Sequence, residues 1–583
     1  METVSYTQLK KLAKQCTEGK QRLAVIGDSA TQQLSTALRG ESVRRNMQLN
    51  VFDADYDQME ALLLDPESEL YAFRPDNILL FPCTEKAKLR FYDTVPAERI
   101  HFAERELARL QMLFAAVRSG SKAKIILSDF PEAEDSVFGS IALRTPQSFA
   151  FQLRKLNMLT AESVAADYSH VYPLALGAVQ TALGREAFFE DRTWYLAKMA
   201  VRTDALLAVA GRVLDLIAAL SGKVKKCVIA DLDNTLWGGV IGDDGMNGIR
   251  LGELGDGPAF TALQRWLLEL RRRGILLCIC SKNNDDTARE PFLHHPEMVL
   301  RLEDIAVFVA NWENKAENIR SIQKILNIGF DSLVFLDDNP FERNLVREML
   351  PEVTVPELPE DPADVPHYLE TLHLFEAAGF SEEDAARTAQ YQAEASRVQS
   401  QAAFTNYEEY LASLDMHGEI RPFDGFHAPR IAQLTQRSNQ FNLRTVRYSE
   451  ADILAMAEDP QYVTRYMTLR DRFGEHGLIS VVILKREDAD TLFVDTWLMS
   501  CRVLKRGVEE CLFDSIVKLT LESGCRTLTA EYLPTAKNKM VADFYDRLGM
   551  TPTGNGRYTL NCADYAMHST HITLDGGAEH AQA

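Results

Sequence analysis

Short apolar runs alternate with longer amphipathic stretches through the first 360 residues, and this alternation restricts the folds that the chain can adopt. The runs RLAVIGD, DNILLFP and AKIILSD precede residue 220, and KCVIAD, GILLCICS, IAVFVA and SLVFLDD follow residue 223. Apolar runs separated by amphipathic helices are typical of parallel sheets covered on both faces. The pattern therefore predicts two α/β domains, at residues 1–220 and 223–360.

The rest of the chain follows a different pattern. Residues 351–366 contain five of the 21 prolines, which neither a helix nor a central strand accommodates. Residues 361–425 have helical spacing and predict a helical linker. The runs GLISVVIL and TLFVDTWLMS, followed by the helix-like VEECLFDSIVKLTLESG, predict an α+β domain at 426–574, with a flexible polar tail at 575–583.

Charge and cysteine content exclude several classes of function. The 583 residues include 63 basic and 84 acidic side chains, and a net charge of −21 disfavours nucleic acid and anionic membranes as partners. No run reaches the roughly 18 apolar residues of a membrane span, and METVSYTQLKKLAKQ lacks the apolar core of a secretory signal. Nine scattered cysteines without paired C-x-x-C motifs fit a reducing compartment, so we expect a cytoplasmic protein.

Four acidic side chains follow apolar runs of the second α/β domain. Asp231 and Asp233 come directly after one run, and Asp337 and Asp338 close a later one. Because residues i and i+2 of a strand point the same way, we expect Asp231 and Asp233 to present two carboxylates at the carboxyl edge of the sheet. Clustered carboxylates suit Mg²⁺, which bridges to phosphate and neutralises its charge.

Two further polar residues fit a phosphate site at the same edge. Ser281 ends the run ILLCICS and offers a hydroxyl to a phosphoryl oxygen, and Lys315 in NWENKAENI offers a compact positive charge. Each of these residues taken singly is as readily a solvated loop residue or a helix cap. The ordered set at four strand ends favours phosphoryl chemistry.

The order D-x-D-x-T, Ser, Lys and DD resembles the four motifs of the haloacid-dehalogenase-like phosphotransferase superfamily. This resemblance implies that Asp231 is the nucleophile that forms an aspartyl-phosphate and that Asp233 is the general acid and base. It also implies that Asp231, the backbone carbonyl of Asp233, Asp337 and Asp338 bind Mg²⁺. Ser281 and Lys315 would then bind the phosphoryl group.

Longer strings narrow the resemblance further. DLDNTLWGGVIGDDG, NWENKAENI, FLDDNPFER and LTQRSNQFNLRTVRYSE are similar to the FkbH-like family, subfamily IIIC of that superfamily and the glyceryl-carrier-protein synthases of polyketide pathways. The resemblance implies a phosphatase and acyltransferase that moves the glyceryl unit of 1,3-bisphosphoglycerate to the phosphopantetheine thiol of an acyl carrier protein and removes its phosphate. Two alternatives stay open, namely a phosphatase for a small metabolite and a non-catalytic carrier-protein docking module.

Residues 426–574 resemble the Gcn5-related acetyltransferases, whose R-x-x-G-x-G loop binds the pyrophosphate of coenzyme A. The segment RVLKRG keeps Arg502 and Gly507 and has Lys505 in place of the middle glycine, which suits the single phosphate of a carrier-bound arm. Next to Arg502, Cys501 is a candidate nucleophile that accepts the glyceryl group, or else a small buried thiol. Lys505 and Arg506 form a possible basic patch for a carrier protein, or else solvated charges.

A polar group in TQRSNQFNLRTVR completes the candidate residues of this region. Its arginines and asparagines suit carboxylate or phosphate recognition, or else form an ordinary helix and loop surface. These residues are Arg437, Asn439, Asn442 and Arg444. His476 in FGEHG is a possible base for thiol chemistry, or else a structural histidine.

The N-terminal domain resembles the SGNH hydrolases through G-D-S at Ser29 and a later D-x-x-H at Asp167 and His170. That family attacks esters with its serine, backed by His and Asp. We favour a degenerate hydrolase fold that serves as a scaffold or docking surface. The complete prediction is an α/β multidomain protein, with a Rossmann-like haloacid-dehalogenase core between an SGNH-like α/β domain and an α+β acetyltransferase-like domain.

Overall fold

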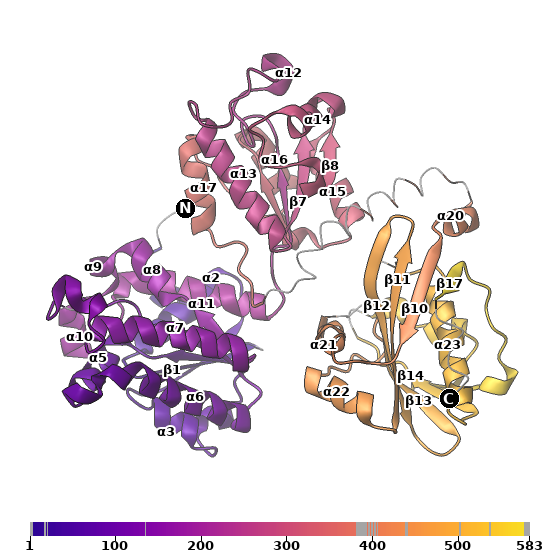
Figure 1. Ribbon diagram of the computed structural model, residues 1–583, viewed down its shortest axis with the longest axis horizontal. Helices are drawn as coiled ribbons and strands as arrows, with labels where there is room; N and C mark the ends of the chain where they lie inside the picture. The colour runs from indigo at the N-terminus through magenta and orange to yellow at the C-terminus, as the bar shows by residue number, and fades with distance from the viewer. Residues whose placement is uncertain are drawn as a thin grey trace. The chain divides into compact units, whose positions relative to one another are not determined.

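The computed structural model resolves the chain into two compact units (Figure 1). Unit 1 contains Met1–Lys225 and His367–Phe380, and unit 2 contains Lys226–Pro366 and Ser381–Ala583. Within these bounds the structure describes residues 4–16, 19, 21–134, 136–379, 393, 397, 400, 404, 406–437, 441–500, 503–535 and 538–575. Among the helices of these residues, none has both the length and the apolar character that crossing a bilayer requires.

Unit 1 is built on a five-stranded parallel sheet with the strand order β2-β1-β3-β4-β5. Its strands are β1 (Gln21–Gly27), β2 (Leu49–Asp53), β3 (Asn77–Phe81), β4 (Lys124–Ser128) and β5 (Val171–Leu174). The runs RLAVIGD, DNILLFP and AKIILSD form β1, β3 and β4, as predicted. The parallel sheet that the sequence predicts for this part of the chain is therefore present.

Both faces of this sheet are covered by helices. Leu23 and Val25 of β1 belong to one apolar core, and Ala24 and Ile26 belong to the other, because successive side chains of a strand point to opposite faces. The first core includes α1 (Tyr6–Ala13), α2 (Gln32–Arg44), α8 (Leu176–Leu183) and α11 (Leu206–Leu220). The second includes α3 (Met59–Leu64), α4 (Glu69–Phe73), α5 (Thr84–Asp93), α6 (Phe102–Gly120) and α7 (Phe149–Asp167).

The first part of unit 2 is a four-stranded parallel sheet with the order β8-β7-β6-β9. The strands are β6 (Cys227–Ala230), β7 (Leu276–Ser281), β8 (Ile305–Ala310) and β9 (Leu333–Leu336). The helices that accompany them are α12 (Ile241–Asp244), α13 (Gly257–Arg272), α14 (Asp285–His294), α15 (Lys315–Leu326) and α16 (Pro340–Met349). All four predicted runs are strands, and each delivers its last residues to the same edge of the sheet.

The second part of unit 2 is an eight-stranded, mostly antiparallel sheet, with the order β15-β16-β14-β13-β12-β11-β10-β17. Its strands are β10 (Met416–Arg421), β11 (Tyr462–Asp471), β12 (Gly474–Arg486), β13 (Thr491–Met499), β14 (Thr527–Glu531), β15 (Thr551–Gly554), β16 (Arg557–Asn561) and β17 (Ile572–Leu574). Among its described residues, the α-helices of this part are α20 (Tyr407–Ser413), α21 (Ala428–Arg437), α22 (Glu450–Glu458), α23 (Val508–Glu522) and α24 (Phe544–Arg547).

Candidate functional site

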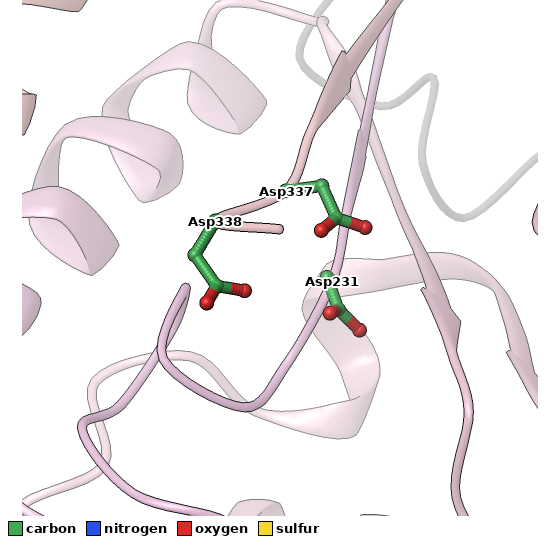
Figure 2. A group of neighbouring side chains, drawn as sticks. All are labelled: Asp231, Asp337 and Asp338. Carbon is green, nitrogen blue, oxygen red and sulfur yellow. The ribbon is translucent and has the colours of Figure 1, made fainter. Parts of the chain in front are cut away.

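Three carboxylates gather where the neighbouring strands β6 and β9 of the four-stranded sheet end (Figure 2). Strands β6 and β9 are parallel neighbours in which Ala230 is opposite Leu336, so Asp231 follows one strand and Asp337 the other at the same level. One oxygen from each of Asp231, Asp337 and Asp338 lies within 4.8 Å of the other two. The predicted carboxylate cluster therefore exists, and it is assembled by the pairing of two strands.

Lys315 lies between two of these carboxylates. It is the first residue of α15, and its Nζ is 2.7 Å from Oδ2 of Asp231 and 2.5 Å from Oδ2 of Asp337. Only 3% of Lys315 is exposed. Although burial disfavours the charged ammonium, the two carboxylates raise the pKa of Lys315 above its ordinary value. This lysine therefore stays charged and holds the nucleophile candidate and the metal-ligand candidate together.

The charge balance at this cluster is incomplete without a cation. Burial, together with the negative charge of Asp231, raises the pKa of Asp337 to about 7. The same two causes raise the pKa of Asp338 above its ordinary value. Among the described residues, Oδ1 of Asp231 is buried and has no hydrogen-bond partner. A buried oxygen without a donor costs roughly 1–3 kcal/mol. The all-oxygen donor set and the unsatisfied oxygen fit a hard divalent cation such as Mg²⁺.

The carboxylate of Asp233 is held by hydrogen bonds beyond the end of strand β6. Strand β6 ends at Ala230, and Asn234 has a left-handed φ of 52°, so strand alternation does not apply beyond Asp231. The side chain of Asp233 is absent from the three-carboxylate cluster of the described residues. It accepts hydrogen bonds from Trp237 Nε1 (2.9 Å), the Ile241 amide (3.0 Å) and Asn283 Nδ2 (2.8 Å). Strand alternation therefore does not orient this side chain, and the pairing of the Asp231 and Asp233 carboxylates stays a prediction.

Ser281 is at the predicted edge, and Asn283 connects it to Asp233. Ser281 is the last residue of β7 and is buried, and its Oγ accepts a 3.4 Å hydrogen bond from Nδ2 of Asn283. The same Nδ2 atom donates to Asp233, so one buried amide orients the candidate phosphate-binding hydroxyl and the candidate acid. Our sequence reasoning missed Asn283, although it stands within the string SKNN.

Arg343 is a second residue that the sequence reasoning missed. Its Nη1 donates to the backbone carbonyls of Asp337 (2.8 Å) and Asp338 (2.6 Å), and the side chain is buried. Two hydrogen bonds from one guanidinium fix the turn after β9, which sets the direction of both carboxylates. The only signal for this role is its place in FLDDNPFER, on the first turns of α16.

Two members of the predicted anion-recognition group, Asn442 and Arg444, contact other residues of the chain. Arg444 pairs with Asp495 and with Glu531, each at 2.9 Å. Asn442 is fully buried and accepts a 2.7 Å hydrogen bond from the Thr445 amide. These contacts hold the loop after α21 in place. Substrate binding by this group therefore stays a prediction, with the first residue, Arg437, ending α21.

Three predicted residues lie outside the part of the chain that the structure describes. They are Asn439, Cys501 and Arg502. Beyond them, Lys505 adopts a left-handed φ of 63° and Gly507 a φ of 81°, just before α23 begins. Lys505 thus takes the backbone conformation that a glycine adopts most easily, at the position where the acetyltransferase motif has one.

His476 belongs to a buried ionic cluster. Its Nε2 lies 3.0 Å from Oδ2 of Asp471. Arg397 also donates two hydrogen bonds to this carboxylate, from Nε to Oδ2 at 2.6 Å and from Nη2 to Oδ1 at 2.7 Å. Burial lowers the pKa of His476, so the ring is neutral near pH 7. Arg506 is also buried and lies 3.9 Å from Asp471. The expectation of an exposed basic patch at Lys505 and Arg506 is therefore wrong for Arg506.

The N-terminal unit does not assemble the hydrolase residues. Ser29 follows the carboxyl end of β1, whereas His170 precedes the amino end of β5 in the same parallel sheet, so the two lie at opposite edges. Asp167 is the last residue of α7, on the side of His170. Ser29 is buried. The D-x-x-H motif therefore lies at the opposite edge of the sheet from Ser29, and the scaffold role of this domain stays a prediction.

Comparison with known proteins agrees with this site. Residues 22–218 match the family described as FkbH, N-terminal domain. The N-terminal part of the protein BF1531 from Bacteroides fragilis, described as containing a phosphatase domain complexed with Mg, is 46% identical at a TM-score of 0.61. The match covers 65% of this chain and 100% of that one. The fold and the carboxylate site define a phosphatase domain of the haloacid-dehalogenase type. The chain belongs to the FkbH-like family.

Two acetyltransferase structures match a smaller part of the chain. The ribosomal-protein-S18-alanine N-acetyltransferase of Escherichia coli is 16% identical over 28% of this chain and 99% of that one, with a TM-score of 0.19. The GNAT domain of PAT from S. lividans is 22% identical over 24% of this chain and 89% of that one, at 0.20. Neither likeness supports a statement about this chain, and the acetyltransferase and SGNH resemblances stay predictions. Among curated proteins, none matches.

Proposed function

We propose that this protein transfers the glyceryl unit of 1,3-bisphosphoglycerate to the phosphopantetheine thiol of an acyl carrier protein, for polyketide-type biosynthesis, and removes the remaining phosphate. One observation carries the phosphatase half. Asp231 has one oxygen held by Lys315 at 2.7 Å and a second oxygen that is buried without a partner. Membership of the FkbH-like family supports the glyceryl half.

In the proposed phosphatase step, a carboxylate oxygen of Asp231 attacks the phosphorus atom and the ester P–O bond breaks. The leaving alkoxide takes a proton from Asp233, so the product is an alcohol and an aspartyl-phosphate. A water molecule then attacks the same phosphorus atom and gives its proton to Asp233. Phosphate leaves, and both aspartates return to their starting states.

The other residues position the phosphoryl group. Ser281 donates its hydroxyl to a phosphoryl oxygen, and Lys315 balances the charge that develops in the transition state. Asp231, Asp337 and Asp338 would hold Mg²⁺, together with the backbone carbonyl of Asp233. When bound, Mg²⁺ would neutralise the negative charge of the phosphoryl oxygens. Asn283 keeps Asp233 and Ser281 in a fixed relation, since its amide contacts both.

For the acyl half, we propose Cys501 as the acceptor. The Cys501 thiol loses its proton to His476, and the thiolate attacks the acyl carbon, so a thioester forms while the acyl C–O bond breaks and phosphate leaves with the proton that His476 held. The pantetheine thiol then attacks the thioester and releases the Cys501 thiol. Asp471 supports the role of His476 as base, because it holds Nε2 of the ring at 3.0 Å and favours its protonated form.

Intact-mass spectrometry of a holo carrier protein tests the whole reaction. We expect a glyceryl adduct on the carrier after incubation with the protein, Mg²⁺ and 1,3-bisphosphoglycerate. With Asp231→Asn the adduct should keep its phosphate, and with Cys501→Ala the carrier should stay unloaded. Release of phosphate from small substrates without any adduct would leave a plain phosphatase. Full loading of the carrier by the Cys501→Ala variant would show that the Cys501 thiol is not the acceptor.

Mg²⁺ should stabilise the protein more at pH 8 than at pH 6. The pKa of Asp337 is about 7 in the fold against an ordinary value of 3.8, so the metal-free fold loses stability as pH rises from about 4 to about 7. A cation must displace the proton of Asp337, so its affinity increases as pH rises through 7. Hydrogen exchange of the amides in β6 and β9, with Mg²⁺ at 100 times its dissociation constant at pH 8, should show a gain of about 2.7 kcal/mol in the stability of this sheet.

The control for this measurement is NaCl at equal ionic strength, with Asp338→Asn as a variant of the exposed member of the cluster. We expect NaCl to give no pH-dependent gain and Asp338→Asn to reduce the gain from Mg²⁺. An equal gain at pH 6 and pH 8, or an unchanged gain in an Asp231→Asn variant, would contradict the carboxylate site.

A further inference from the structure

A large cleft opens at the edge of the unit 1 sheet that is opposite to Ser29. Its volume is about 990 Å³. The first residues of three parallel strands line it, namely Gln21 of β1, Asn77 of β3 and Lys124 of β4. Leu220, the last residue of α11, also lines the cleft. The cleft is thus formed by the framework of the sheet.

The charge of this cleft is opposite to that of the whole chain. Its lining contains five basic side chains and a single acidic one, in a chain of net charge −21. The basic residues are Arg22, Arg74, Arg118, Lys122 and Lys124, and the acidic residue is Asp76. Across the described part of the chain, no carboxylate pairs with any of these five, whereas cations such as Arg44, Arg90 and Lys315 have such partners. Five uncompensated cations lining one cleft attract a polyanion.

Contacts inside the cleft keep two of these cations in place. Nη1 of Arg22 donates to the carbonyl of Phe73 at 3.2 Å, and Nζ of Lys124 donates to the carbonyl of Leu220 at 3.0 Å. The carboxylate of Asp76 accepts a 2.7 Å hydrogen bond from the backbone amide of Arg22. Neutral carbonyls leave both cationic charges uncompensated. The remaining three, Arg74, Arg118 and Lys122, are exposed at the rim.

We propose that this cleft binds an acidic protein surface, that of the acyl carrier protein, an inference that rests on the acyl half of the proposed function. A chain of net charge −21 repels an acidic partner over most of its surface, so docking needs a local region of opposite charge. The cleft supplies this region. Its 990 Å³ and its five dispersed cations exceed what one phosphate group requires.

Reversing two rim charges tests the proposal. Arg118→Glu with Lys122→Glu changes two exposed side chains and leaves the phosphatase site intact. The probe is a fluorescently labelled acidic holo acyl carrier protein, with binding measured by anisotropy. We expect the dissociation constant to rise at least about tenfold at low salt, and the difference to shrink as added NaCl screens the charges. A circular dichroism spectrum checks that the variant is folded.

The matched control reverses two lysines elsewhere on the same unit. Lys10→Glu with Lys11→Glu alters exposed residues of α1 and changes the net charge equally. This variant should bind the carrier within about twofold of the native protein. An equal loss of affinity in both variants would show that the net charge of the protein causes the effect, and it would contradict the cleft as the binding site. Unchanged affinity of the Arg118 and Lys122 variant would also overturn it.

Two further probes separate this proposal from the proposed function. Binding of poly-L-glutamate that depends on Arg118 and Lys122, without binding of the carrier, would uphold an acidic-polypeptide cleft and count against the carrier reaction. Carrier loading at an unchanged rate in the charge-reversed variant, at subsaturating carrier, would uphold the reaction and overturn the cleft. Tighter saturable binding of single-stranded RNA than of either acidic polypeptide would overturn the choice of a protein partner.

Discussion

Asp231→Asn should lower phosphate release by at least about a thousandfold, because an amide cannot form the aspartyl-phosphate. The substitution keeps the size of the side chain and still offers an oxygen to Lys315, whose Nζ is 2.7 Å from the native carboxylate. Lys315 also keeps its contact with Asp337 at 2.5 Å. We therefore expect a folded protein that has lost its chemistry. The measurement is phosphate release from a phosphomonoester under saturating Mg²⁺.

The matched control for this variant is Asp243→Asn. Asp243 lies in α12, in the same insertion after β6, and is exposed. It should keep activity within about twofold of the native protein, since surface changes away from the site have small effects. Asp231→Asn with more than a tenth of native activity would exclude Asp231 as the nucleophile. A normal circular dichroism spectrum distinguishes lost chemistry from lost folding.

Lys315→Met should destabilise the phosphatase sheet by roughly 3–5 kcal/mol at pH 8 in the absence of divalent cations, the usual cost of removing one partner of a buried ion pair. The variant leaves the carboxylates of Asp231 and Asp337 buried and facing each other. The loss should be smaller at pH 5.5, because the pKa of Asp337 is already about 7 with Lys315 present and the group is then protonated.

Hydrogen exchange of the amides in β6 and β9 measures this loss within the affected sheet, which a whole-chain melting curve of several domains cannot resolve. Lys324→Met is the matched control, because Lys324 is an exposed residue of the same helix, α15. We expect this control to change protection by less than about 0.5 kcal/mol. Equal protection in Lys315→Met and the native protein at pH 8 would show that Lys315 does not balance these carboxylates.

The sequence predicts the strands whose apolar runs are continuous, and it misses those with a weaker pattern. Continuous runs such as DNILLFP and SLVFLDD form β3 and β9 because both of their faces are covered. The strand β11, YVTRYMTLRD, escaped prediction because Thr and Arg residues interrupt its apolar residues. Only pairing with β10 and β12 makes it a strand. The strands β2 (LNVFD) and β5 (VYPL) were also missed, because Asn50 interrupts the apolar run of the first and Pro173 that of the second.

The candidate site shows the same division. The types of residue and their place after apolar runs predicted Asp231, Ser281, Lys315 and Asp337, because parallel strands deliver their ends to one edge. Strand alternation does not orient the carboxylate of Asp233, since the chain turns directly after β6. The role of Asn283 also escaped prediction, because it depends on Asp233, which follows the neighbouring strand β6, as well as on Ser281 at the end of the preceding strand β7.

The sequence by itself determined the alternation that builds the parallel sheets and the chemistry available at their edges, because both follow from local periodicity and residue type. The tertiary structure alone decided which of these side chains meet. Pairing of β6 with β9 brings Asp231 to Asp337, although the two are far apart in the chain. The edge of the unit 1 sheet likewise gathers five scattered cations into one cleft of an acidic protein. Contacts of this kind depend on the order of the strands in the sheet, which the local sequence does not encode.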